Sequence, residues 1–481
     1  MEPCPASFNL AEYVLRKAHK HPDKVALSIL GPYKSERWSY AKLEHAVRAV
    51  GAGLLDLGLI PGDRLLLRLG NGLSFPLAYL GAIAVGIVPI PTSAQLTTAE
   101  LDRILPSTGF TAVVAEHGIA LPSDVSIEIK DTALLAMAKG TPAEFAMGDP
   151  ERLAYILFTS GTSGQPRAVA HAHRAIWARQ MMFDGWYGLR SDDRLLHAGA
   201  LNWSFTLGTG LLDPWTVGAT ALIPANGTSI DTLPLLLKRH DASLFAAAPG
   251  VLRVLLKEPG KLALTKLRHT LTAGEHLLPS IRDGWEHATG KGLYDAYGLT
   301  ECSTFLSSNA DGARSLTIQP GRKIRLSDDG EISIHRDEIG LMLGYLEGDE
   351  MRLPLTEDHF MTGDRMTQAE SGTLAYEGRV DDMMNCGGYR VSPLEVESVL
   401  ASVPAIGDVA VCSVPINDAS IIAAFYTGNP TMDEQGIRAY LADSLARYKQ
   451  PRSILRVAEL PRKTNGKLQR KALPDLWRAH Q

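Results

Sequence analysis

Residues 157–175, LFTSGTSGQPRAVAHAHRA, place many small and hydrogen-bonding residues between an apolar run and a helix-like stretch. Gly161 and Gly164 allow backbone angles that other residues avoid, so successive N–H groups can turn toward one centre. Arg167 adds a positive charge. Such a loop suits an anionic polyphosphate, although it lacks the GxxxxGK[ST] pattern of a Walker A loop and could be a flexible surface turn. Four hydroxyl donors lie in it: Thr159, Ser160, Thr162 and Ser163.

Three other positions carry groups that could act on a charged substrate. The carboxylate of Glu301 directly follows Thr300, which suits a hard cation but is also typical of a solvated or capping acid. Asp364 follows a glycine, as in many turns. Lys467 lies in PRKTNGKLQRK, which could be a mobile basic tail or could present an ammonium group to an anion.

The loop sequence TSGTSGQPRAV resembles the TSGTTGxPKGV signature of the adenylate-forming enzymes, which include acyl- and aryl-CoA ligases, peptide-synthetase adenylation domains and luciferases. Further motifs of that family follow in the family's order, so the resemblance covers nearly the whole chain. They are Ala273-Gly274-Glu275, DAYGLTE at 295–301, Thr362-Gly363-Asp364, GRVDDMMNCGGYRVSPLEVE at 378–397, and Asn465-Gly466-Lys467.

The resemblance implies a two-step, ATP-dependent ligation of a carboxylic acid to coenzyme A. A carboxylate is a poor electrophile, so it first attacks the α-phosphate of ATP, which yields an acyl-AMP and pyrophosphate. The acyl carbon then accepts a thiol. Because both reactants of the first step are anions, catalysis requires positive charge and donors that hold them in line. ATP, Mg²⁺ and coenzyme A are the implied cofactors and co-substrates.

Roles for individual residues follow from the same resemblance. Glu301 would bind Mg²⁺, and Thr300 would contact the α-phosphate. Lys467 would lie over the α-phosphate and the carboxylate during adenylation and then withdraw. Asp364 and Arg379 would bind the ribose. The remaining nucleotide-binding set is Thr159, Ser160, Gly161, Thr162, Ser163, Gly164, Arg167, Ala273, Gly274, Glu275, Asp295 and Tyr297, of which Ala273 and Gly274 would pack on the adenine and Tyr297 would stack on it.

The family's C-terminal domain swings between the two half-reactions, and its hinge matches Asp381 here. Gly387 and Gly388 would line the pantetheine channel in the second pose. The chain departs from the family pattern at Arg167-Ala168, which replaces a usual Lys-Gly and keeps the charge with another shape, and at Asn385, often a lysine. These departures motivate one alternative, a non-catalytic nucleotide or acyl binder.

The acid-binding pocket is expected around Trp203, Phe205 and Phe305, an apolar and partly aromatic set. The surrounding sequence looks most like benzoate-type aryl-CoA ligases, although a medium acyl chain would fit nearly as well. We find no pair of charges suited to an α-amino acid. A second alternative is a stand-alone adenylating enzyme that loads a separate carrier protein, since no LGG[HD]S-type phosphopantetheine site is present in this sequence.

We expect an α/β fold to position these residues. The chain should have at least two domains, because 481 residues exceed the size of a single core. Residues 39–57 have the spacing of an amphipathic helix, with Ser39 at its N-cap and Gly58 after its end. Alternation of helix-like and strand-like segments predicts doubly wound parallel sheets. After residue 310 the pattern becomes β-rich, with a DDG turn. We expect a core domain, 1–380, with a small β-barrel-like part, and a small mobile α+β domain, 381–481.

Composition excludes several classes of protein. We find no signal peptide, and the apolar segment 75–91 is broken by glycine and proline, which favours a buried helix followed by a strand over a membrane span. Four cysteines without a CxxC pair favour a reducing, cytoplasmic location. Residues 444–481 carry a net charge of +8 against −13 in the rest. No nucleic-acid reader motif accompanies this basic segment, so nucleic acid is not an expected partner.

Overall fold

The computed structural model describes residues 2–159, 166–257, 262–308, 315–380, 382–386, 389–416, 419–462 and 466–480. It divides into two compact units, which are treated separately below. Unit 1 comprises Met1–Gly274, Trp285–Lys323 and His335–Phe360, and unit 2 comprises Glu275–Gly284, Ile324–Ile334 and Met361–Gln481. The expected division of the chain at residues 380/381 stays a prediction.

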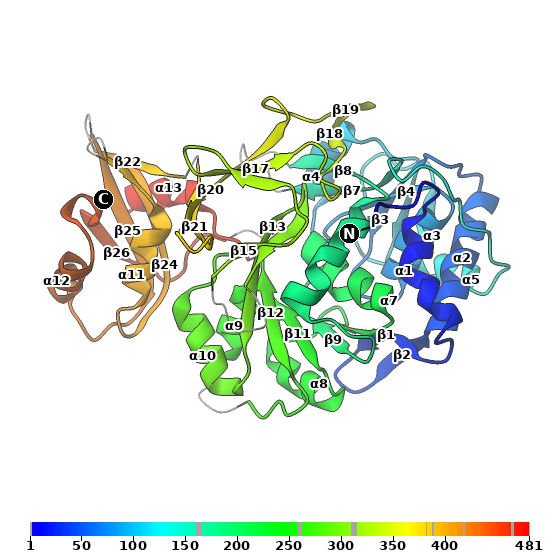
Figure 1. The fold of residues 1–481 in the computed structure, drawn as a ribbon, viewed down its shortest axis with the longest axis horizontal. Helices are drawn as coiled ribbons and strands as arrows, with labels where there is room; N and C mark the ends of the chain where they lie inside the picture. Colours follow the sequence, from blue (N-terminus) through cyan, green and yellow to red (C-terminus); the bar gives the residue numbers. More distant parts are fainter. Residues whose placement is uncertain are drawn as a thin grey trace. The chain divides into compact units, whose positions relative to one another are not determined.

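The largest sheet of unit 1 has nine strands in the order β15-β14-β13-β12-β11-β9-β10-β1-β2 (Figure 1). Its central strands pair in parallel, and strands β2, β14 and β15 pair antiparallel at the two edges. The parallel strands are β1 Val25–Leu30, β9 Arg194–His197, β10 Thr220–Pro224, β11 Leu244–Ala247, β12 His269–Ala273 and β13 Leu293–Leu299; the edge strands are β2 Ser35–Ser39, β14 Ser303–Ser307 and β15 Thr317–Ile318.

Two four-stranded sheets complete the strands of unit 1. The first is parallel, in the order β4-β3-β5-β6, and the second is antiparallel, in the order β19-β18-β8-β7. Their strands are β3 Arg64–Arg68, β4 Val88–Pro91, β5 Ala112–Ala115 and β6 Glu128–Lys130, then β7 Leu153–Thr159, β8 Arg167–Ala172, β18 Gly344–Glu347 and β19 Glu350–Arg352. The predicted alternation of helix-like and strand-like segments along this part of the chain is confirmed.

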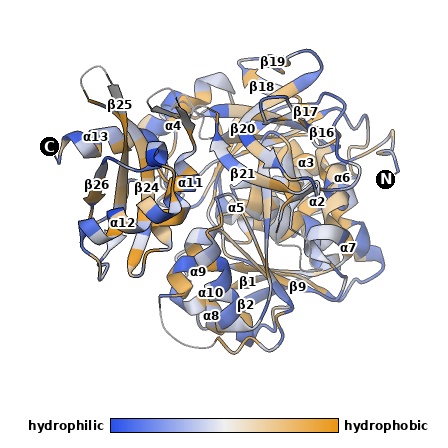
Figure 2. Cartoon of the chain, turned by 60° about the vertical axis from the view of Figure 1, so that its left-hand side comes forward, coloured by the Kyte–Doolittle hydropathy of each residue, from blue (hydrophilic) through white to orange (hydrophobic). Residues whose placement is uncertain are grey.

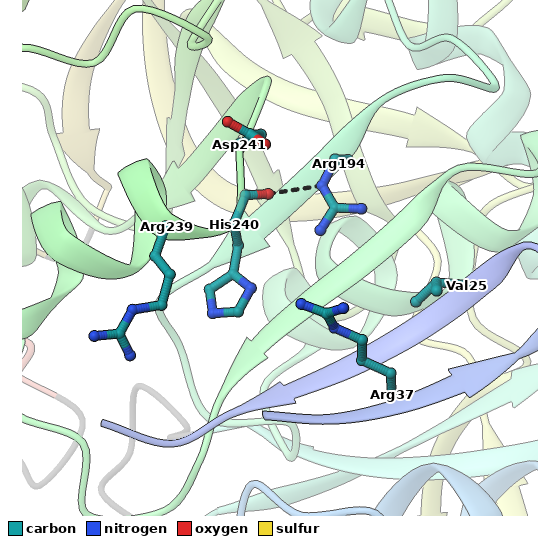
Figure 3. Close-up of a pocket in the computed structure, with 6 residues that line it drawn as sticks. All are labelled: Val25, Arg37, Arg194, Arg239, His240 and Asp241. Carbon is teal, nitrogen blue, oxygen red and sulfur yellow. Dashed lines mark hydrogen bonds between the residues drawn. The ribbon is translucent and has the colours of Figure 1, made fainter. Parts of the chain in front are cut away.

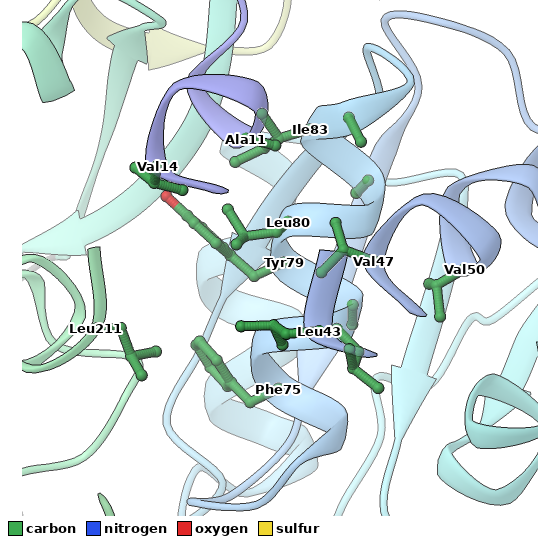
Figure 4. Packing of buried hydrophobic residues seen from close by; sticks show 14 of the residues in the cluster. Ala11, Val14, Leu43, Val47, Val50, Phe75, Tyr79, Leu80, Ile83 and Leu211 are labelled. Atoms are coloured by element: carbon green, nitrogen blue, oxygen red, sulfur yellow. The ribbon is translucent and has the colours of Figure 1, made fainter. Parts of the chain in front are cut away.

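Helices cover the parallel sheets, as the alternating pattern predicts. The predicted helix at 39–57 is α2, Tyr40–Asp56, and the Ser39 side chain accepts a hydrogen bond from the Lys42 N–H at its start. All residues of α3 are buried, and its Phe75, Tyr79 and Leu80 pack against α2 and α1 (Figure 4). The α-helices from the N-terminus to residue 289 are α1 Leu10–Leu15, α2, α3 Ser74–Ala84, α4 Thr98–Ile104, α5 Asp131–Met137, α6 Ala175–Ala178, α7 Asp213–Val217, α8 Leu233–Arg239, α9 Pro249–Leu255 and α10 Pro279–Thr289.

The buried helix α3 runs into strand β4, so the apolar segment 75–91 forms the helix and strand that its glycines and proline predict. Among the residues that the structure describes, no helix has both the length and the apolar character needed to cross a membrane.

Unit 2 is β-rich and contains the C-terminal α+β part. A four-stranded sheet has the order β16-β17-β20-β21, in which β16 pairs antiparallel with β17 and β20 with β21. The DDG turn connects β16 and β17, and there the Ser327 N–H donates to the Glu331 carbonyl. Strands β24 and β25 of the C-terminal sheet contain many hydrophobic residues, drawn in orange in Figure 2, and these residues belong to two buried clusters. The elements are β16 Ile324–Leu326, β17 Glu331–His335, β20 His359–Gln368, β21 Leu374–Arg379, β22 Met384–Cys386, β23 Tyr389–Val391, α11 Pro393–Ala401, β24 Ile406–Ile416, β25 Ala419–Gly428, α12 Glu434–Ser444, β26 Ser453–Arg456 and α13 Leu473–Arg478.

Candidate functional site

The glycine- and hydroxyl-rich loop connects two paired strands. Strand β7 ends at Thr159 and β8 begins at Arg167, and these two residues are direct partners in the antiparallel ladder. The hairpin therefore holds both ends of the loop at a fixed separation. Five residues of the predicted polyphosphate loop, Ser160, Gly161, Thr162, Ser163 and Gly164, lie outside the described residues.

Glu301 is held by two side chains that come from strands of one sheet. The Tyr345 hydroxyl on β18 donates to Oε1 of Glu301 over 2.8 Å, and Nη2 of Arg167 lies 3.9 Å from the same oxygen. The Arg167 guanidinium also lies over the Tyr345 ring, 3.9 Å from its centroid. Strands β8 and β18 are paired, with Tyr345 opposite Val169, so the sheet fixes this arrangement. The structure thus brings together Arg167 and Glu301, two residues that were predicted separately as parts of the site.

The backbone beside Glu301 is anchored by a histidine of β8. His171 Nε2 lies 2.8 Å from the Thr300 carbonyl oxygen, and its ring stacks on Tyr155 with 4.8 Å between centroids. A carbonyl only accepts hydrogen bonds, so Nε2 carries the proton. Complete burial lowers the pKa of His171 to about 4, so the ring is neutral at pH 7. Strand β8 therefore positions both Thr300 and Glu301.

An aromatic cluster lies at the carboxyl ends of the central parallel strands, where α/β sheets bind their ligands. Gly274 follows β12 with φ of +92°, and a Cβ there would lie 2.4 Å from the Trp203 ring. Only glycine tolerates both conditions. Trp203 meets Phe205 edge-on at 5.3 Å, and both pack in one hydrophobic cluster with Ala273. The structure thus brings together Ala273, Gly274, Trp203 and Phe205.

Tyr297 and Phe305 form a second aromatic pair, on neighbouring strands β13 and β14. Their rings meet edge-on with 5.4 Å between centroids, and Phe305 is fully buried. Asp295 lies on the same strand as Tyr297, and its backbone N–H donates to the Ser308 hydroxyl over 2.9 Å. Asp295 is the register partner of Thr272 on β12, which places it beside the strand that leads to Gly274.

In unit 2, Asp364 and Arg379 are direct partners on strands β20 and β21. Nη1 of Arg379 lies 3.2 Å from Oδ2 of Asp364, and the Tyr376 hydroxyl donates to Oδ1 over 2.8 Å. Gly363 has φ of +72°, and a Cβ there would lie 2.5 Å from Nη2 of Arg379. The carboxylate of Asp364 is therefore fixed on both oxygens. Burial, together with the Asp364 charge, raises the pKa of Tyr376 well above its usual value, so its hydroxyl stays protonated.

Lys467 lies between Gly466 and Leu468, two residues that Arg462 contacts. Arg462 and Leu468 form an isolated β-bridge, and Nη1 of Arg462 donates to the Gly466 carbonyl over 2.7 Å. Nη2 of Arg462 also pairs with Oδ2 of Asp408 at 2.8 Å, which ties the turn to strand β24.

Three residues after Lys467, Arg470 anchors the chain in the C-terminal part. Its guanidinium pairs with Glu397, which is 6% exposed, and its Nε lies 3.7 Å from Oδ2 of Asp382. The Val411 N–H donates to the same Glu397 carboxylate over 2.7 Å. One arginine therefore links the segment carrying Lys467 to the residue after the expected hinge. The expected hinge residue Asp381 and the glycines Gly387 and Gly388 lie outside the described residues.

Sequence reasoning did not single out several residues of these arrangements, among them Tyr345, Tyr376, Arg470 and His171. Tyr345 and Tyr376 lie on strands, where a tyrosine is ordinarily part of the core. For Tyr376 and Arg470 the sequence offered one signal, their position near a motif: Tyr376 lies two residues before the GRVDD segment, and Arg470 lies three residues after Lys467. Neither position specifies a partner.

Comparison with known families gives the chain's class. The model of the AMP-binding enzyme family matches residues 14–346, and that of the AMP-binding enzyme C-terminal domain matches residues 395–467. The chain belongs to the AMP-binding enzyme family. The resemblance to adenylate-forming enzymes is confirmed, and with it the predicted α/β fold and the class of acid–thiol ligases.

Individual relatives span nearly the whole chain. The mitochondrial acyl-coenzyme A synthetase ACSM2B of Homo sapiens is 29% identical, with 98% of this chain and 91% of the relative covered. The benzoate–CoA ligase of Thauera aromatica is 28% identical, with 90% of each chain covered. The crystal structure of a benzoate CoA ligase from Burkholderia xenovorans LB400 is similar, with a TM-score of 0.87, 27% identity, and 97% and 100% of the two chains covered.

Proposed function

We propose that this AMP-binding enzyme is an aryl-CoA ligase that activates a benzoate-like acid as its acyl-AMP and transfers the acyl group to coenzyme A. The observation that carries the proposal is the arrangement of Glu301, Tyr345 and Arg167 beside a hairpin whose loop has the family's polyphosphate signature. A carboxylate and a cation next to the loop that is predicted to bind the triphosphate support a reaction in which both reactants are anions.

Each of these residues would have its own role in the first step, the formation of the acyl-AMP. The loop donors and Arg167 would bind the phosphates, and Thr300, held by His171, would contact the α-phosphate. Asp364 has its two oxygens oriented by Tyr376 and Arg379, which suits hydrogen bonds from the two ribose hydroxyls. Lys467 would neutralise charge that develops between the carboxylate and the α-phosphate.

Glu301 fits a role as a Mg²⁺ ligand. Its Oε1 accepts the Tyr345 hydroxyl, whereas its Oε2 accepts no hydrogen bond among the described residues. The described part of the chain holds no group of three or more His, Cys, Asp or Glu side chains suited to a metal. One carboxylate is enough for Mg²⁺ that is also bound by substrate phosphates. When bound there, the ion would neutralise phosphate charge.

The aromatic cluster supports an aryl acid as substrate. Trp203 and Phe205 present apolar rings beside Gly274, and a flat aromatic acid gains both burial and edge-to-face contacts from such surfaces. Two of the relatives above are named benzoate CoA ligases, and their preference is extended here to this chain as part of the proposal. Phe305, whose ring packs edge-on against Tyr297, would add a further apolar surface to the acid-binding pocket.

The deciding experiment measures carboxylate-dependent exchange of labelled pyrophosphate into ATP with a panel of acids. Benzoate and its ring-substituted derivatives should support faster exchange than linear acids of six to eight carbons, with coenzyme A then yielding a thioester. Exchange with no acid of the panel would identify a non-catalytic binder, and acyl transfer to a carrier protein but not to coenzyme A would identify a carrier-loading enzyme. A cytoplasmic location, suggested by the isolated cysteines, belongs to the same proposal.

The Tyr376→Phe variant tests the ribose site. It keeps the ring and removes the hydrogen bond to Asp364, so we expect the KM for ATP to rise about 3- to 10-fold, the value of one hydrogen bond of about 1 kcal/mol, with kcat nearly unchanged. Tyr33→Phe makes the same chemical change at a side chain that is 96% exposed and should leave KM as it is. An unchanged KM in Tyr376→Phe would remove Asp364 from the ribose site.

The Asp381→Pro variant tests the hinge. Proline fixes φ near −65° and removes an N–H, so it should restrict a backbone change at this position. We expect thioester formation from added acyl-AMP to slow by roughly tenfold or more, while pyrophosphate exchange changes much less. Equal losses in both half-reactions would count against a hinge at Asp381.

A further inference from the structure

Unit 1 contains a cavity of about 210 Å³ that is lined by three arginines, a histidine, a valine and an aspartate (Figure 3). The lining residues are Val25, Arg37, Arg194, Arg239, His240 and Asp241. The arginines come from three elements: Arg37 from β2, Arg194 from the first position of β9, and Arg239 from the last position of α8. In Figure 3 the Arg37 side chain points toward His240 and Arg194, and the His240 ring lies between Arg37 and Arg239, whose guanidinium points away from the other two.

This cavity is separate from the candidate site described above. Val25 and Arg194 begin the parallel strands β1 and β9, and His240 and Asp241 precede β11. The cavity therefore lies at the amino-terminal edge of the sheet, whereas Ala273 and Gly274 lie at the carboxyl end of β12. An activity assigned to the carboxyl edge leaves these arginines unused.

The positive charge of the cavity is only partly compensated, by Asp241 among the lining residues. None of the three arginines forms an ion pair with a described residue, and the side chain of Arg37 forms no hydrogen bond with one, although its backbone pairs with Ser28 in the sheet. Arg194 Nε donates to the His240 carbonyl over 2.6 Å, and Arg239 Nη1 donates to the Pro32 carbonyl over 2.7 Å, which leaves most guanidinium N–H groups available. Burial and the three nearby arginines lower the pKa of His240, so the histidine is neutral and the cavity carries a net charge of +2.

We propose that this cavity binds a phosphate group. A tetrahedral dianion presents oxygens in several directions, which suits a cavity lined by guanidinium groups from three elements, whereas a carboxylate presents only two oxygens in one plane. One water molecule needs about 10–15 Å³ of cavity volume, so a cavity of about 210 Å³ has room for a phosphate group and part of the molecule that carries it. Ser35, whose hydroxyl lies 3.2 Å from His240 Nε2, adds a neutral donor beside the cavity.

The first test follows arginine modification by a phenylglyoxal reagent, read out peptide by peptide by mass spectrometry. At constant ionic strength, inorganic phosphate in place of chloride should slow modification of Arg37 and Arg239 at least fivefold. Arg103, an exposed arginine on α4 with no ion pair, is the matched control and should react at the same rate in both salts. Unchanged rates at Arg37 and Arg239, or equal protection of Arg103, would overturn the proposal.

The second test measures affinity by calorimetry in an Arg167→Gln background, which weakens phosphate binding at the candidate site. Adding Arg37→Gln and Arg239→Gln should weaken binding of inorganic phosphate at least tenfold, whereas adding Arg103→Gln should not. Pyrophosphate and glycerol phosphate, titrated in parallel, distinguish a free polyphosphate from a phosphomonoester as the natural source. Equal affinity with and without the two cavity arginines would refute the site. Because Arg37 and Arg239 are exposed, these variants should fold normally, and their pyrophosphate exchange should match that of the Arg167→Gln background.

Discussion

Replacing Lys467 by alanine should reduce carboxylate-dependent pyrophosphate exchange by roughly 10²–10³-fold or more, the cost of losing one group that stabilises charge in a transition state. The same variant should still convert added acyl-AMP and coenzyme A into the thioester, because the proposed ammonium acts only in the first step. The measurement is a comparison of the two half-reactions in the same protein preparation.

The structure makes this test specific to one lysine. The Arg462–Leu468 bridge and the Arg470–Glu397 ion pair hold the chain on both sides of Lys467, so an alanine there should not alter the fold around it. Lys471→Ala removes a neighbouring exposed ammonium and is the matched control, with exchange expected to stay within about twofold. If Lys467→Ala retained full exchange, or lost both half-reactions equally, the assignment of Lys467 to adenylation would be wrong.

The local parts of this fold could be predicted because they depend on residues close in sequence. The helix α2 is set by its apolar spacing and its Ser39 cap, and the Thr159–Arg167 hairpin brackets a loop with no bulky side chains. The motifs follow one another in the family's order, and this resemblance suggested roles for Glu301, Asp364 and Lys467. Their roles remain predictions, because a family match assigns no role to a single residue, and Asp364 lies outside the matched ranges 14–346 and 395–467.

The partners of these residues could not be predicted, because they depend on strand pairing across long stretches of chain. Tyr345 reaches Glu301 only because β18 pairs with β8 in one particular register. A shift of one residue would turn Tyr345 to the other face of the sheet. Arg470 and Glu397 are 73 residues apart, and nothing near either one indicates the other. The cavity lined by Arg37, Arg194 and Arg239 likewise combines residues from four separate segments of the chain.

The Glu301→Gln variant should lower pyrophosphate exchange by roughly 10²-fold, because it keeps the shape of the side chain but removes the charge that a Mg²⁺ ligand needs. The Mg²⁺ concentration that gives half the maximal rate should also rise. Glu347→Gln removes an exposed carboxylate two residues from Tyr345 on the same strand, and its exchange should be unchanged.

Tyr345→Phe separates a ligand role for Glu301 from a purely structural one. It leaves the carboxylate charged but removes the hydrogen bond that orients Oε1, and groups that orient a metal ligand typically contribute about 10–100-fold. We therefore expect a loss near the lower end of that range, with a smaller rise in the half-saturating Mg²⁺ concentration than in Glu301→Gln. A structural role predicts instead that both variants lower thermal stability while their Mg²⁺ dependence stays that of the unmodified chain. Because Arg167 contacts both side chains, through the Tyr345 ring and Oε1 of Glu301, the double variant should lose less than the product of the two single losses.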